Sequence, residues 1–93
     1  MELPQNIEEL RNLKILLIND DFFILQILTM VMKQEYIRDI DVAYNGFEGY
    51  NKAIKKSYDL IICDLNMPVM DGFQFCTNFI KFFNDNNNFF DPN

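Results

Sequence analysis

The chain has 93 residues, of which 49% are hydrophobic and 15% aromatic, and it carries a net charge of −6. This length allows one small domain, and the apolar content suffices for a packed core, which excludes tandem catalytic domains and a fully disordered chain. The acidic balance and the lack of a lysine or arginine cluster argue against a nucleic-acid-binding surface. Divalent cations or basic partners would suit this charge, although solubility alone also accounts for it.

Cys63 and Cys76 lie within apolar runs, and the sequence contains no histidine. Neither a zinc-finger spacing nor a Cys/His catalytic pair is therefore available, and a reduced, cytoplasmic setting is expected. The longest apolar run, residues 22–32, is too short to span a membrane, and the acidic, polar N-terminus does not resemble a signal peptide. We expect neither export nor membrane insertion.

Residues 1–12 are polar and mixed, as in a linker or a short helix. The apolar run at 13–18 is typical of a parallel strand that is covered on both faces. A helix follows, because apolar residues recur at helical spacing along one side. These residues are Ile24, Ile27, Leu28, Val31 and Met32, with Phe23 and Met30 along one flank. That flank is either core that lacks its cover or a docking surface for a partner.

The pattern then repeats. A second strand is predicted at 40–44 and a third at 58–63, each followed by a helix, the first at 47–56 with Ala53 and Ile54 inward. In that helix Lys52, Lys55 and Lys56 are expected to face outward. Asp71 is expected to cap the last helix, whose apolar stripe is Phe73, Cys76, Phe79, Ile80 and Phe83. Residues 84–93 have no periodicity and are interpreted as a low-complexity tail, which leaves 13–83 as the domain.

Alternating strands and helices with right-handed crossovers give an α/β fold with a parallel sheet between helices. In such sheets ligands bind beyond the carboxyl ends of the strands. Asp20 and Asp64 come directly after the first and third strands, so we expect two carboxylates to converge there. Two carboxylates about 4 Å apart repel by about 4 kcal/mol at an effective dielectric constant near 20, so they need a counter-charge.

Magnesium supplies such a counter-charge, because it prefers hard oxygen ligands and binds through one or two carboxylates plus a phosphate oxygen. Asp20 and Asp64 are the candidate metal ligands, together with the main-chain carbonyl of Asn66 in the following turn. With the metal in place, a carboxylate oxygen of Asp64 can attack phosphorus in line and form an aspartyl phosphate. Gly72 removes a side chain where the loop meets the last helix.

The nine residues Asp64-Leu65-Asn66-Met67-Pro68-Val69-Met70-Asp71-Gly72 closely resemble the phosphorylation-site segment of two-component response-regulator receiver domains. Upstream, Ala43-Tyr44-Asn45-Gly46 and residues 58–63 follow in the order and spacing of that family. The resemblance implies a CheY-like, partial flavodoxin-like doubly wound sheet with strand order 2-1-3 and three βα units. It implies that Asp64 is the acceptor, that Asp20 and the Asn66 carbonyl hold Mg2+, and that Met67 and Pro68 shape the supporting turn.

Two departures from the family pattern affect whether the chain can bind Mg2+ and accept a phosphoryl group. Asn19 stands where the family usually has a carboxylate, so Mg2+ binding is expected to be weaker, with the amide still able to hold a metal-bound water. Asp21 is adjacent and could substitute, although an acid there is more often a helix cap. The family's fourth strand with Thr or Ser, and its fifth with a phosphate-binding Lys, have no counterpart before Asn93. A fragment, a truncated gene product or a degenerate copy would each explain this.

Three functions remain open. The favoured one is a phosphorelay module, not an independent enzyme, that takes a phosphoryl group from a histidine kinase or a histidine phosphotransfer protein, or is fused to a hybrid sensor kinase. The second is a degenerate receiver that only binds a protein partner. The third is a phosphatase of the aspartyl-phosphate type, which the sequence disfavours because Asn66 stands where a second Asp is normally found.

Overall fold

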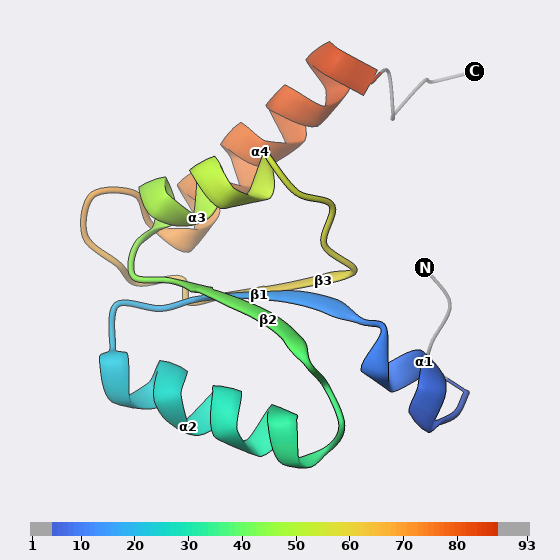
Figure 1. Cartoon of the computed structure of the whole chain (residues 1–93). Helices are drawn as coiled ribbons and strands as arrows, with labels where there is room; N and C mark the ends of the chain where they lie inside the picture. The colour runs from blue at the N-terminus through green and yellow to red at the C-terminus, as the bar shows by residue number, and fades with distance from the viewer. Residues whose placement is uncertain (1–4, 88–93) are drawn as a thin grey trace.

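The computed structural model describes residues 5–87, and its centre is a sheet of three parallel strands (Figure 1). The strands are β1 (Lys14–Ile18), β2 (Asp39–Ala43) and β3 (Leu60–Cys63), in the order β2-β1-β3. In the pairing register Ile18 lies opposite Ala43 on one side and Cys63 on the other. The predicted strand order 2-1-3 and the doubly wound α/β architecture are confirmed.

Helices cover both faces of this sheet. Helix α2 (Phe22–Gln34) lies on one face, and α3 (Gly46–Ala53) and α4 (Gly72–Asn87) lie on the other, while the short α1 (Ile7–Arg11) precedes β1 (Figure 1). Helix α2 ends where Tyr36 adopts a φ of 75° and its N–H donates to the carbonyl of Lys33. Among the described residues no helix is both long and apolar enough to cross a bilayer.

The core has two halves, one on each side of β1. Leu16 and Ile18 face α3 and α4, where they pack with Ala43, Ala53 and Phe75. Ile15 and Leu17 face α2, where their fully buried partner is Leu25. All four of these β1 side chains are buried, as expected for a central parallel strand covered on both faces.

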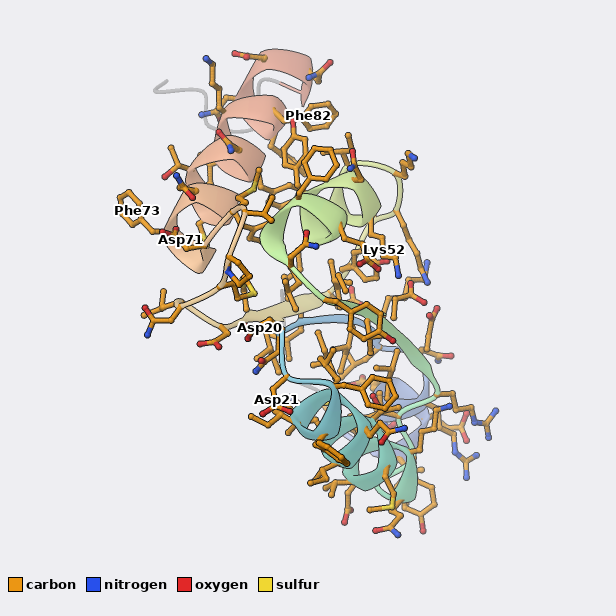
Figure 2. The ribbon with its side chains drawn as sticks, turned by 90° about the vertical axis from the view of Figure 1, so that its left-hand side faces the viewer. Asp20, Asp21, Lys52, Asp71, Phe73 and Phe82 are labelled. Atoms are coloured by element: carbon orange, nitrogen blue, oxygen red, sulfur yellow. The ribbon has the colours of Figure 1, made fainter. Side chains whose placement is uncertain are left out.

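Both helical stripes predicted from periodicity are only partly confirmed: Leu28 and Met32 of α2 and Phe79 of α4 pack against the core, but the most buried residue of each helix was not predicted. The buried residue of α2 is Leu25, which is 2% exposed and was not part of the predicted stripe, whereas Ile24, Ile27 and Val31 are exposed. In α4 the buried residue is Phe75, while Phe73 is 74% exposed and points away from the molecule in Figure 2. Apolar residues occur nearly all around α2, and in α4 they cover a face wider than the part that packs, so spacing alone does not select the buried stripe. Phe23 and Met30 are likewise exposed within the described chain.

Several element ends also differ from the prediction. Helix α3 ends at Ala53 instead of residue 56, and β3 begins at Leu60 instead of residue 58. Helix α4 continues to Asn87, through part of the asparagine-rich segment that was expected to be a loop, and residues 88–93 of that segment lie outside the described residues. The alternative of a short helix within residues 1–12 is confirmed by α1.

Candidate functional site

The strand pairing brings the carboxyl ends of β1 and β3 to one edge of the sheet. The N–H of Asp64 donates to the carbonyl of Ile18 at 2.9 Å, and the N–H of Asn19 donates to the carbonyl of Ala43 at 3.1 Å. The hydrogen bonding of the sheet therefore extends one residue beyond β1 and one beyond β3. It fixes the backbone positions of Asn19 and Asp64. The start of α2 and the connections β2–α3 and β3–α4 gather at this same edge, at the left of Figure 1.

A hollow of about 270 Å3 opens at this edge between β1, β3 and α2. Asn19 and Asp64 form part of its wall, so the structure brings these two predicted site residues together. The remaining wall is apolar or sulfur-bearing and consists of Leu17, Ile18, Ile24, Leu25, Leu28, Ile62 and Cys63. The polar groups of the hollow are thus concentrated at the strand ends.

The two candidate acids carry few interactions of their own. Asp64 is half-buried, and its Oδ1 accepts one long hydrogen bond of 3.4 Å from the N–H of Asn66. Asp20 is exposed, and in the described part of the chain its carboxylate has neither a hydrogen-bond partner nor an ion pair. No lysine or arginine of residues 5–87 forms an ion pair with either group. Carboxylate oxygens are therefore available to a ligand at this edge.

Asn19 and Asp21 are engaged in forming the start of α2. The side-chain oxygen of Asn19 accepts a hydrogen bond of 2.9 Å from the N–H of Asp21. Asp21 Oδ1 in turn accepts from the N–H groups of Phe23 at 2.9 Å and Ile24 at 3.3 Å, so it caps the helix. The expectation that Asp21 is a helix cap is confirmed, and its role as a substitute metal ligand is correspondingly disfavoured. Asp20 and Asp21 are labelled at this edge in Figure 2.

The donor set suits magnesium better than a metal held by protein side chains alone. Within residues 5–87, no group of three or more His, Cys, Asp or Glu side chains is close enough to hold a metal ion. Two unpaired carboxylates and a main-chain carbonyl supply only part of an octahedral shell. Mg2+ retains several waters and takes phosphate oxygens, so a sparse set of hard oxygen ligands fits it.

The segment that follows Asp64 is held against α4. The N–H of Gly72 donates to the carbonyl of Leu65 at 3.1 Å, and a Cβ at Gly72 would lie 2.4 Å from the carbonyl oxygen of Asp64. The expectation that Gly72 is needed for a close approach is therefore confirmed. Asp71 caps α4, since its Oδ1 accepts from the N–H of Gln74 at 2.8 Å and its own N–H donates to Gln74 Oε1 at 3.1 Å.

Within this segment the supporting residues differ in exposure. Met67 and Met70 are half-buried and pack against the α3–α4 side of the core, whereas Asn66 and Pro68 are exposed. The carbonyl of Pro68 accepts from the N–H of Met70 at 2.8 Å. Val69 adopts a φ of 71°, which is unfavourable for a β-branched residue. The turn thus places the side chains of the two methionines in the core and leaves Asn66 exposed at the surface.

Cys63 directly precedes Asp64. Its thiol contacts the carbonyl oxygen of Asp64 at 3.4 Å, and burial raises the pKa of the thiol to about 11. The thiol is therefore protonated at neutral pH, which is consistent with a structural rather than a nucleophilic role.

A separate charged cluster lies on β2 and in the connection from α3 to β3. Lys56 Nζ donates to Asp39 at 2.7 Å and to Asp41 at 2.9 Å, and the hydroxyl of Tyr58 donates to Asp41 at 2.6 Å. The hydrogen bond from Tyr58, with a smaller effect from Lys56, keeps the pKa of Asp41 below its usual value despite partial burial. Burial and the neighbouring Asp41 raise the pKa of Tyr58 to about 12. Lys56, which was expected to point outward, instead joins the α3–β3 connection to β2.

The fold and this edge define a class of protein: a doubly wound α/β domain with unpaired carboxylates beyond the carboxyl ends of its strands. The chain belongs to the response regulator receiver domain family, which it matches over residues 15–86. It is therefore a receiver domain of two-component signalling.

Individual relatives agree with this assignment. The chain is 45% identical over 65 residues to hybrid signal transduction histidine kinase B of Dictyostelium discoideum, an alignment that covers 69% of this chain and 3% of that protein. The fold is similar to that of chemotaxis protein CheY4 of Vibrio cholerae, with a TM-score of 0.69 and 33% identity over 74% of this chain and 57% of that one.

A second solved structure, the CheX-CheY-BeF3-Mg2+ complex from Borrelia burgdorferi, matches with a TM-score of 0.71 and 29% identity. That match covers 75% of this chain and 54% of the other. The chain thus spans little more than half of these solved chains and a small part of the hybrid kinase.

One residue of the edge was not predicted to take part in the site. Gly46, which was named only as part of the family-like segment Ala43-Tyr44-Asn45-Gly46, donates its N–H to the carbonyl of Met70 at 3.1 Å. The signal in the sequence was the Asn45-Gly46 pair, since a glycine can mark a close approach of two backbones as well as a turn.

Proposed function

We propose that this receiver domain accepts a phosphoryl group on Asp64 in a reaction that requires Mg2+. The observation that supports the proposal is the strand pairing, which sets Asp64 beside Asn19, the residue before Asp20, with no cationic side chain of the described chain paired to either acid. A half-buried carboxylate with free oxygens at a strand-end site is suited to attack an electrophilic phosphorus.

Some residues of the site would bind Mg2+, and Asp64 would also attack phosphorus. Asp20, Asp64 and the main-chain carbonyl of Asn66 would hold Mg2+, which when bound neutralises charge on the phosphoryl oxygens. A carboxylate oxygen of Asp64 forms the new bond to phosphorus while the bond from phosphorus to the donor's histidine nitrogen breaks, and that nitrogen keeps the electron pair and takes a proton. Asn19, Met67, Pro68 and Gly72 shape and support the edge without contacting phosphorus.

The donor is proposed to be a histidine kinase or a histidine phosphotransfer protein, and the chain is proposed to function in the cytoplasm, as part of a hybrid kinase or as a separate regulator. The likeness to hybrid signal transduction histidine kinase B supports the hybrid arrangement. The domain is proposed to span at least residues 13–83, and its last helix, α4, continues to residue 87.

The test is phosphorylation by acetyl phosphate, with intact-mass spectrometry to detect the addition of one phosphoryl group. The wild type should gain the group only when Mg2+ is present, and hydroxylamine, which cleaves acyl phosphates, should remove it. Asp64→Asn should not gain it, whereas the matched control Asp85→Asn, an exposed acid on α4, should behave as wild type. Equal labelling of Asp64→Asn and wild type would disprove the assignment.

The alternative is a degenerate receiver that binds a partner without being phosphorylated. The observation that favours it is Asn19, which replaces a charge at the site and whose side-chain oxygen is already bonded to the N–H of Asp21. Mg2+ titration of the wild type and Asn19→Asp separates the two functions. We expect the variant to bind Mg2+ more tightly, and equal affinity would show that Asn19 does not weaken the site.

A further inference from the structure

Two connections that are distant in the sequence meet at the candidate site through their backbones. The N–H of Gly46, the first residue of α3, donates to the carbonyl of Met70, which lies two residues before α4. Gly46 is buried, and Met70 is half-buried against the core. Among the main-chain hydrogen bonds of residues 5–87, this one alone joins the segment 65–71 to the β2–α3 connection.

The approach is possible only because residue 46 has no side chain. A Cβ at Gly46 would lie 2.1 Å from the carbonyl oxygen of Met70 and 2.9 Å from its carbonyl carbon. These are backbone atoms, so they cannot rotate away as the end of a side chain can. Gly46 does not have a positive φ, so the requirement for glycine here comes from the close contact and not from the backbone conformation.

The contact acts on the part of the segment that would hold the metal. The segment is fixed at its start by the N–H of Asp64 on β1 and at its end by the bond from Gly72 to Leu65. Between these points lie the carbonyl of Asn66 and, two residues further on, a turn at Val69 in which the carbonyl of Pro68 accepts from the N–H of Met70. A shift of Met70 would therefore move that turn, and with it the Asn66 carbonyl, relative to the carboxylate of Asp64.

We propose that Gly46 is a positioning residue for the phosphorylation-site segment, and that its contact with Met70 sets the affinity of the site for a divalent cation. The inference rests on the proposed function, because it assumes that the Asn66 carbonyl and Asp64 share the cation. Gly46 itself touches neither the cation nor the phosphoryl group. It acts through Met70, in the way that groups behind metal ligands fix ligand geometry.

The test compares Gly46→Ala with Gly49→Ala. Gly49 is also buried in α3, and a Cβ there would lie 2.4 Å from Ile18 Cδ1, which is the end of a side chain and not a backbone atom of the segment. Both variants should lower the melting temperature. Only Gly46→Ala should raise the Mg2+ dissociation constant, by about ten-fold or more, as measured by amide chemical shifts during titration. Wild-type affinity in a folded Gly46→Ala variant, or an equal loss in Gly49→Ala, would overturn the proposal.

A measurement on the wild type covers the case in which Gly46→Ala does not fold. Coupling between sites is reciprocal, so Mg2+ binding should slow hydrogen exchange of the Gly46 amide. The Gly49 amide, bonded to the carbonyl of Asn45 within the same helix, should be unaffected. Mg2+ binding without a change at Gly46 would overturn the inference alone. If the wild type binds no Mg2+, the proposed function fails instead, and with it the premise of the inference.

Discussion

Val69 lies in the phosphorylation-site segment with a φ of 71°, a conformation that a β-branched residue adopts only at a cost. The left-handed region costs an L-residue about 1–2 kcal/mol, whereas glycine enters it freely. The Val69 side chain is 80% exposed, so its removal sacrifices little burial. Glycine costs about 0.5–1 kcal/mol of additional chain entropy, so Val69→Gly should gain about 0.5–1 kcal/mol of stability.

The assay is thermal and urea unfolding followed by circular dichroism. For a domain of this size, a gain of about 0.5–1 kcal/mol corresponds to a rise of about 2–8 °C in melting temperature. Val31→Gly is the matched control, because Val31 is also partly exposed but lies within α2, where glycine is unfavourable. The two variants should shift the melting temperature in opposite directions. A lower melting temperature in both variants would show that the conformation of Val69 is not strained.

Two further predictions concern protons. Because the pKa of Tyr58 is raised to about 12, the folded state holds this proton more tightly than the unfolded chain, so stability should fall as the pH rises from about 10 to 12. Unfolding midpoints across this range should fall less steeply in Tyr58→Phe, and parallel curves would contradict the prediction. Because burial raises the pKa of the Cys63 thiol to about 11, its thiolate fraction at pH 8 should be far below that of a free cysteine. Alkylation by iodoacetamide with peptide mapping should therefore label the exposed Cys76 first, and equal rates would be evidence against burial of Cys63.

The sheet was predictable because its signals are local and strong. The run at 13–18 is apolar at nearly every position, which is typical only of a strand covered on both faces, and four of its residues are buried in β1. The carboxylates that end the first and third strands follow from the same pattern, because parallel strands place their carboxyl ends at one edge. Asp21 and Asp71 were predictable as caps, since an acid before an apolar helix has a specific geometric role.

The packing faces of the helices were not predictable in the same way. In α2 the apolar residues surround most of the helix, and in α4 they form a face wider than the part that packs, so periodicity alone does not identify the residues that contact the sheet. The sheet selects Leu25 in α2 and Phe75 in α4, because these face Leu17 and Ile18 on β1. The predicted ends of the helices were wrong for a related reason. Helix α4 continues into the asparagine-rich segment because a helix already anchored on the core can extend through residues of modest propensity.

The contact between Gly46 and Met70 illustrates a third limit. A pattern of residues identifies an acid at a strand end, but it does not indicate which of two nearby connections approaches the other. That information is contained in backbone distances, here a 3.1 Å hydrogen bond between residues far apart in sequence. A Cβ added at any of the three glycines would lie within 2.5 Å of another atom. A glycine in the sequence therefore indicates a close contact, but it does not indicate which residue makes that contact.

Asn19 connects the fold to the proposed chemistry most directly. Its side-chain oxygen accepts from the N–H of Asp21, and a carboxylate in Asn19→Asp could accept the same bond, so the start of α2 should be preserved. The added charge would lie beside Asp64 in the same hollow, where like charges repel by a few kcal/mol at most at an effective dielectric near 20. Without Mg2+ the variant should therefore be less stable than wild type, and with saturating Mg2+ the difference should shrink or reverse. Melting curves in both conditions distinguish this from a structural defect, which would lower stability equally with and without the cation.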